Sequence, residues 1–185
     1  MTPARPDQAR ATASEDAARI VDRNSGPTAA PLDPHPQLRL YVETFLKTFL
    51  LEGRVDPRLR ELVILRIAWR CGQPYEWAQH YRRARSFQVT DDDIVSMRAD
   101  DLEVVADESL RLLARAADEV VDLGRISAET YQSCGSYFDD PAVLHEFLHL
   151  VAGYRMMATV LNTTLPSIEA AGLPRWPPDG KGPRH

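Results

Sequence analysis

Apolar residues along this chain recur at intervals of three and four positions, which is the spacing of an amphipathic helix. The first such series consists of Leu38, Val42, Phe45 and Phe49. It ends at Gly53, and a glycine just beyond the last apolar position is typical of a helix C-terminus. No stretch shows the apolar and polar alternation of a half-buried strand, bounded by turn residues. The pattern therefore predicts an all-α fold.

The next predicted helix is apolar on nearly its whole circumference. Asp56 and Pro57 supply an N-cap residue and a proline at the first helical position, and RLRELVILRIAWRCG follows them. Because a helix without a polar face cannot lie at the surface, we expect this one at the centre of the fold. A further helix begins near Pro74 and carries YEWAQHYRRARSF.

The second half of the chain continues the helical pattern. Thr90 and Asp93 form a capping-box-like start for DDDIVSMRAD, and the helical segments DESLRLLARAADEVVDLG and SAETYQSCGSYF follow. Asp140 and Pro141 repeat the cap and proline pair and open a long helix through about Leu165. We therefore expect a single-domain bundle of about seven or eight helices.

Both ends of the chain differ in composition from this helical part. Residues 1–33 are rich in Pro, Ala, Asp, Arg and Ser, which is typical of a mobile arm. Residues 173–185 form a second Pro- and Gly-rich end with one aromatic residue, Trp176. The predicted organisation is an arm over 1–33, a helical domain over 34–172 and a tail over 173–185.

Composition excludes several classes of function. The chain has 185 residues, 44% of them hydrophobic, and a net charge of −5 with the basic residues dispersed among acidic ones. This distribution argues against nucleic acid as a partner. No run approaches the roughly 20 apolar residues of a membrane span, and the first residues lack the apolar core of a signal peptide, so we expect a cytoplasmic protein. Cys71 and Cys134 form neither a disulfide framework nor a C-x-x-C pair.

The segment HEFLHL contains the His-Glu-x-x-His box of zinc peptidases, with His145 and His149 as ligands and Glu146 as base. Glu169 follows at a spacing suitable for a third ligand. Such peptidases bind substrate along a sheet edge, which an all-helical chain does not offer. The box also lies on a helix whose apolar positions are needed for packing. We expect no metal site here and retain a zinc hydrolase only as an alternative.

A second group of candidate residues lies on the two central helices. Glu61 interrupts an apolar helix, where a carboxylate needs a proton, a cation or a hydrogen-bond donor. Glu76 and His80 are four residues apart on the next helix and share a face. The short connection between the helices could bring Glu61 toward His80, giving a general acid/base pair. A surface Glu-His pair with a separate structural glutamate remains the other interpretation.

The stretch DPRLRELVILRIAWRCGQPYEWAQHYRRARSFQVTDDDI resembles the carboxymuconolactone decarboxylase family, which includes the alkylhydroperoxidase D-like proteins. The segment LVAGYRMMATVLN is similar to a part of the family's last long helix. The peroxidase branch has a glutamate, a C-x-x-C pair and a histidine four residues later. Glu61 and His80 match the glutamate and the histidine, while Gln73 and Glu76 occupy the cysteine positions. Cys71 lies two residues too early to replace either cysteine.

This departure argues against thiol peroxidase activity, because that cycle needs a nucleophilic and a resolving thiol. The resemblance instead implies a decarboxylase or a related lyase or isomerase that needs no cofactor and acts on a small carboxylated lactone or organic acid. His80 is then the general acid/base, Glu61 orients it, and Glu76 is a second proton carrier or substrate ligand. Four further residues are candidates for substrate binding: Arg66 for a carboxylate, Gln73 for a carbonyl oxygen, and Tyr75 and Trp77 as pocket walls.

The resemblance also implies self-association as a dimer, a trimer or a hexamer. A central helix that is apolar all round agrees with this, because a small bundle does not easily bury so much apolar surface alone. A non-catalytic oligomer that binds a small ligand remains the main alternative to an enzyme.

Overall fold

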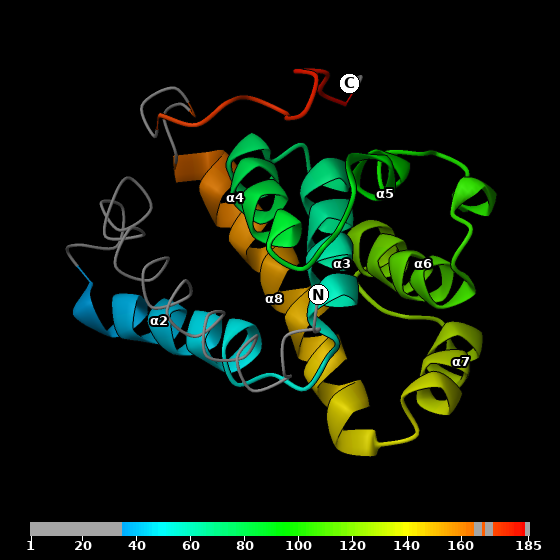
Figure 1. Cartoon of the computed structure of the whole chain (residues 1–185). Helices are drawn as coiled ribbons and strands as arrows, with labels where there is room; N and C mark the ends of the chain where they lie inside the picture. The colour runs from blue at the N-terminus through cyan, green and yellow to red at the C-terminus, as the bar shows by residue number, and fades with distance from the viewer. Residues whose placement is uncertain (1–34, 165–167, 169–171, 184–185) are drawn as a thin grey trace, which may run out of the picture. The chain divides into compact units, whose positions relative to one another are not determined.

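A computed structural model of the chain describes residues 35–164, 168 and 172–183. Over these residues the fold is all-helical, which confirms the predicted fold class (Figure 1). With the labels of Figure 1, the elements are α2 (Pro36–Leu50), α3 (Pro57–Arg70), α4 (Pro74–Arg85), α5 (Asp91–Ser96), the short 3-10 helix η2 (Leu102–Val104), α6 (Glu108–Leu123), α7 (Ala128–Phe138) and α8 (Pro141–Thr164). The predicted arm over 1–33 lies outside the described residues.

The chain separates into two units, residues 1–53 and 54–185. In the first unit, α2 begins with Pro36 at its N-terminus and carries a tilted contact between the rings of Phe45 and Phe49, whose centroids are 4.7 Å apart. Lys47 forms an exposed ion pair with Glu52 just beyond the last turn. The remaining elements, α3 to α8, belong to the second unit.

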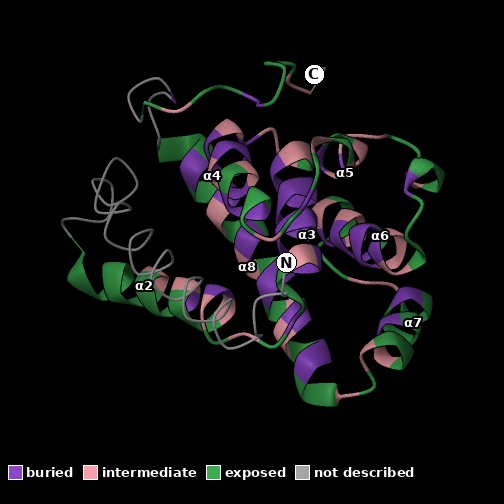
Figure 2. Ribbon diagram, viewed as in Figure 1, coloured by how far each residue is buried: buried purple, intermediate pink, exposed green. Residues whose placement is uncertain are grey.

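Helix α3 is the central element of the second unit and packs against α4, α6 and α8. Asp56 caps it by accepting a hydrogen bond from the amide of Leu59, as its sequence predicted. Ten consecutive residues of α3, from Leu59 to Ala68, are buried, and Figure 2 shows this helix buried over most of its length. Full burial of a large aliphatic side chain contributes about 1.5–3 kcal/mol, so α3 supplies much of the stability of the core.

A tight connection reverses the chain between α3 and α4. Gly72 has a φ of 61°, a left-handed conformation that glycine adopts without steric cost. The amide of Gln73 donates to the carbonyl of Ala68, and its side-chain oxygen accepts from the amides of Tyr75 and Glu76. Gln73 is therefore the N-cap of α4. The turn places α4 against α3, and this contact assembles the candidate site.

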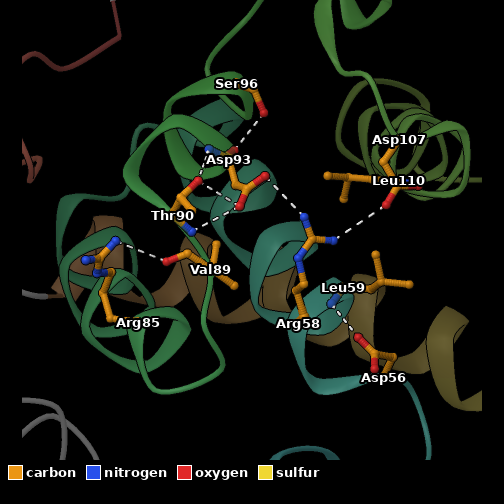
Figure 3. A network of polar contacts seen from close by, with 10 residues as sticks. All are labelled: Asp56, Arg58, Leu59, Arg85, Val89, Thr90, Asp93, Ser96, Asp107 and Leu110. Carbon is orange, nitrogen blue, oxygen red and sulfur yellow. Dashed lines mark hydrogen bonds and ion pairs between the residues drawn. The ribbon is translucent and has the colours of Figure 1, made fainter.

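Polar contacts near the start of α3 join it to two other helix N-termini (Figure 3). The guanidinium of Arg58 lies 3.1 Å from Asp93 in α5 and 3.5 Å from Asp107, the N-cap residue of α6. Thr90 and Asp93 form the predicted capping box, each side chain accepting the other's backbone amide. Arg58 therefore links three helices by contacts at their first turns.

Arg66 fixes the other side of α3. Its guanidinium binds both carboxylate oxygens of Asp118 on α6 at 2.7 Å and also donates to the carbonyls of Met97 and Ala99 beyond α5. Arg66 is only 1% exposed. A buried arginine needs this number of acceptors to offset the loss of its hydration.

Within the described part of the chain, no helix is both long and apolar enough to cross a membrane.

Candidate active site

Glu61 on α3 and His80 on α4 form a direct hydrogen bond. Nδ1 of His80 lies 2.7 Å from Oε2 of Glu61. Both residues are buried, Glu61 completely and His80 with 7% of its surface exposed. The short turn between the two helices brings these residues together, so that one carboxylate oxygen is committed to the imidazole.

The second oxygen of Glu61 is held by two guanidinium groups. Oε1 accepts from Nε of Arg83 at 2.8 Å and from Nε and Nη2 of Arg60 at 3.1 and 3.0 Å. Burial alone would raise the pKa of Glu61, but His80, Arg60 and Arg83 together lower it to about 2. The carboxylate is therefore ionised across the neutral pH range.

The charge on Glu61 determines where the imidazole proton lies. An ionised carboxylate can only accept hydrogen bonds, so Nδ1 of His80 must be the donor in the 2.7 Å contact. In the neutral imidazole the other nitrogen, Nε2, then carries the lone pair. Glu61 thus fixes one tautomer of His80 and leaves Nε2 available for proton transfer.

Glu76 is the second carboxyl group of the candidate site and lies one helical turn before His80. It is 4% exposed, and its Oε2 has no hydrogen-bond partner among the described residues. Burial raises the pKa of Glu76 well above its ordinary value. The raised pKa favours the protonated, neutral form of this carboxyl group, which can donate a proton, in contrast to Glu61.

Tyr154 on α8 contacts His80 and was not among the residues selected from the sequence. Its ring meets the imidazole edge to face, with centroids 5.1 Å apart and planes at 84°. Burial raises the pKa of Tyr154 well above its ordinary value, and the charge of Glu61 raises it further. Its place in the family-like segment LVAGYRMMATVLN was the one sequence signal, but the spacing gave no reason to assign it to the site.

The four residues that the sequence suggested for substrate binding each contact other parts of the protein. Gln73 caps α4 and donates to Asn162, and the hydroxyl of Tyr75 accepts from Gln79. Trp77 is fully buried, and its indole N–H donates to the carbonyl of Pro177. Arg66 is bound to Asp118, so the geometry gives no support to its predicted contact with a substrate carboxylate. Substrate contacts by these four residues remain predictions.

The His-Glu-x-x-His box has a structural contact in this fold. Both oxygens of Glu146 accept the amide of Arg54 at 2.8 and 2.9 Å, and one of them also accepts the amide of Val55 at 3.0 Å. His145 and His149 are exposed on α8, and Nδ1 of His149 lies 2.7 Å from the carbonyl of His145. Glu169 lies outside the described residues. Among those that are described, no group of three His, Cys, Asp or Glu residues could hold a metal ion.

The thiol of Cys71 is close to the candidate site in sequence but is not activated. Burial raises its pKa to about 11. Cys134 on α7 is also buried, and its pKa is raised to about 11. Both thiols are therefore protonated at neutral pH, whereas a peroxidatic cysteine reacts as the thiolate.

We compared the chain with models of known protein families, with curated proteins and with solved structures. The model of the Carboxymuconolactone decarboxylase family matches residues 36–119, a range that includes Glu61, Glu76 and His80. No curated protein and no solved structure gives a significant match to the chain. The resemblance found in the sequence is thereby confirmed over residues 36–119, the part of the chain that the carboxymuconolactone decarboxylase family model matches.

Proposed function

We propose that this protein is a cofactor-independent decarboxylase, or a related lyase or isomerase, that acts on a small carboxylated lactone or a similar organic acid. The observation that carries this proposal is the 2.7 Å contact between Nδ1 of His80 and an ionised, fully buried Glu61. A carboxylate in this position orients the imidazole and stabilises the imidazolium that forms when Nε2 accepts a proton.

The reaction requires proton transfer and an electron sink. When the carbon–carbon bond to the carboxylate breaks, its electron pair moves into the conjugated carbonyl of the lactone and carbon dioxide leaves. The resulting dienolate must then receive one proton at carbon, so that each turnover consumes one proton from solvent. His80 is the general acid/base for this step, because Nε2 can exchange a proton while Glu61 holds Nδ1–H.

Glu76 supports the same chemistry as a second proton carrier. It is neutral in the fold and lies on the face of α4 that carries His80. Donating its proton would leave a charge in a buried position, which favours rapid return of a proton to it. This arrangement suits a group that passes a proton on and does not retain the charge.

The test is turnover of a panel of small carboxylated lactones by the wild type and by His80→Asn. Asparagine can still donate to Glu61 but cannot exchange a proton at neutral pH. We expect a loss of about 10²- to 10⁴-fold in kcat, which is the range typical of general acid/base groups. His149→Ala removes an exposed histidine and is the matched control. Full turnover by His80→Asn would remove His80 from the mechanism.

A non-catalytic, ligand-binding protein is the second candidate, and the burial of the site favours it. The side chain of Glu61 is fully buried and that of His80 is 9% exposed. If no lactone in the panel is consumed but one raises the melting temperature of the wild type and not of Glu76→Gln, the ligand-binding function is supported.

Under either function we propose a cytoplasmic homo-oligomer, and sedimentation of the full chain tests the assembly.

A further inference from the structure

The chain has three tryptophans, and all of them meet in one cluster outside the acid/base pair. Trp69 comes from α3, Trp77 from α4, and Trp176 from residues 172–183, which we name the C-terminal strap. The ring centroids are 5.5 Å apart for Trp69 and Trp77, 5.4 Å for Trp69 and Trp176, and 5.8 Å for Trp77 and Trp176. Trp176 is 5% exposed, so the strap buries its single aromatic side chain against the tryptophans of both helices.

Polar contacts fix the backbone of the strap beside this cluster. The carbonyl of Pro177 accepts from the indole of Trp77 at 2.7 Å and from Nη2 of Arg98 at 2.8 Å. Nη1 of Arg98 forms an ion pair with Asp179 at 2.7 Å. The guanidinium carbon of Arg98 also lies 4.8 Å from the ring centroid of Trp77 and 5.1 Å from that of Trp69. The strap therefore contacts α3, α4 and the end of α5.

The docked conformation of the strap is specific. Trp176 has a φ of 51°, which a bulky side chain adopts only when its surroundings impose it. Gly182 passes so close to the indole that an added Cβ would lie 2.6 Å from Nε1 of Trp176. A tail held only by nonspecific apolar contact would show neither feature.

Trp77 connects the strap to the candidate site, because it lies between Glu76 and His80 on α4. Its indole N–H is buried, and the carbonyl of Pro177 is the acceptor for it. Removing that acceptor would leave a buried donor unsatisfied, a cost that α4 can relieve by shifting. Proton-transfer sites tolerate displacements of only about 0.5 Å, so even a small movement of α4 would affect His80.

We propose that the C-terminal strap is a positioning element for the acid/base pair, with Trp176 as its anchor and Pro177 as its contact to α4. Docking of the strap sets the position of α4 at which Nδ1 of His80 meets Glu61. This inference rests on the proposed function only for its kinetic consequence. The geometric consequence, the state of the His80–Glu61 hydrogen bond, can be observed without any substrate.

The experiment uses the full chain and four variants. Trp176→Ala removes the anchor, and Gly182→Ala places a Cβ 2.6 Å from Nε1 of Trp176, so that the indole must leave its docked position. Trp176→Phe retains an aromatic ring and serves as the conservative variant. Lys181→Ala changes a strap side chain that is 82% exposed and is the matched control.

Three measurements are made on each protein. Tryptophan emission reports docking, because all three tryptophans lie in the cluster. Proton NMR follows the downfield Nδ1 resonance of the His80–Glu61 hydrogen bond, which is assigned by its absence in His80→Asn. Steady-state kinetics then separate kcat from KM.

For Trp176→Ala and Gly182→Ala we expect red-shifted emission, a weakened or lost Nδ1 resonance and a fall of about 10- to 100-fold in kcat with little change in KM. Trp176→Phe and Lys181→Ala should resemble the wild type. Red-shifted emission with an unchanged Nδ1 resonance would overturn the proposal, and so would emission from Trp69 and Trp77 that stays unshifted in Trp176→Ala. If Trp176→Ala does not fold, Gly182→Ala decides by the same criteria. Activity retained by His80→Asn would count against the proposed function alone.

Discussion

Glu61 and Glu76 are two buried carboxyl groups associated with His80, and their pKa values shift in opposite directions. Glu61 is hydrogen-bonded to His80 and is flanked by Arg60 and Arg83, so its pKa falls to about 2 despite burial. For Glu76 burial is the cause of the shift, and it raises the pKa well above its ordinary value. One carboxyl group is therefore ionised and the other neutral at the same pH, which is the division of roles that acid/base catalysis needs.

Glu61 should stabilise the fold at neutral pH and lose this contribution in acid. Its folded pKa is depressed from 4.5 to about 2, so the contribution is complete above about pH 4.5 and disappears as pH falls toward 2. We expect Glu61→Gln to lower the free energy of unfolding at pH 7 by about 3–5 kcal/mol, because Arg60 and Arg83 lose a buried partner. Urea unfolding between pH 2 and 7 measures the difference.

Glu108→Gln is the control for this prediction, since the side chain of Glu108 is 89% exposed. The gap between Glu61→Gln and the wild type should narrow below pH 4.5, whereas Glu108→Gln should follow the wild type throughout. A gap of constant size down to pH 2 would contradict the depressed pKa of Glu61.

Glu76 should have the opposite effect on the pH dependence of stability. Its folded pKa lies above its unfolded value, so the folded state holds a proton that the unfolded chain releases above about pH 4.5. Each further pH unit then costs up to about 1.4 kcal/mol until the folded pKa is reached. Glu76→Gln removes this cost, so we expect it to gain stability relative to the wild type between pH 4 and pH 8.

The same variant should turn over substrate more slowly, because glutamine cannot carry a proton. Glu129→Gln makes the same substitution at an exposed position on α7 and is the matched control. If Glu76→Gln differed from the wild type by the same free energy of unfolding at pH 4 and at pH 8, Glu76 would not be a neutral acid in the folded protein.

Arg66 should be a structural residue whose loss destabilises the fold. Arg66→Met leaves the carboxylate of Asp118 without its bidentate partner and the carbonyls of Met97 and Ala99 without a donor. We expect a loss of about 3–5 kcal/mol in the free energy of unfolding, the range for breaking a buried ion pair.

Arg70→Met provides the comparison on the same helix. Its nearer partner, Asp122, is 50% exposed, and its second partner, Asp118, lies 3.6 Å away. An exposed pair of this kind contributes about 0–1 kcal/mol. If Arg66 binds a substrate carboxylate, as its sequence position predicted, Arg66→Met would instead remain stable and show a raised KM.

Glu146 should stabilise the entry into α3 without any metal. Its carboxylate accepts the amides of Arg54 and Val55, and removing it leaves both donors unpaired. We expect Glu146→Ala to lower the free energy of unfolding by about 1–3 kcal/mol. His149→Ala should have little effect, because this histidine is exposed. A melting temperature that falls with a chelator in the wild type, but not in His149→Ala, would favour the zinc alternative.

The sequence could predict the helices because the forces that specify them act over a few residues. The start of α3 follows from Asp56 and Pro57, and the start of α5 from Thr90 and Asp93. The shared face of Glu76 and His80 follows from helical geometry alone. The resemblance carried by α3 and α4 was equally accessible, because it resides in consecutive residues.

Other features of the site could not be predicted in this way. Tyr154 is distant in sequence from His80, and no local spacing indicates that their rings meet. Arg66 was expected to face a substrate, because an arginine in an apolar helix needs an anion. The amino-acid sequence alone could not show that α6 supplies an anion for Arg66, the carboxylate of Asp118.

By itself the sequence determined an all-helical chain, the caps of its helices and the family resemblance of residues 36–119. The tertiary structure decided which buried charges meet: Glu61 with His80, Arg66 with Asp118, and Glu146 with the amides that precede α3. The physical reason is the range of the interactions. Helix propensity and capping are local, whereas a buried polar group is satisfied by whichever partner helix packing brings within hydrogen-bond distance.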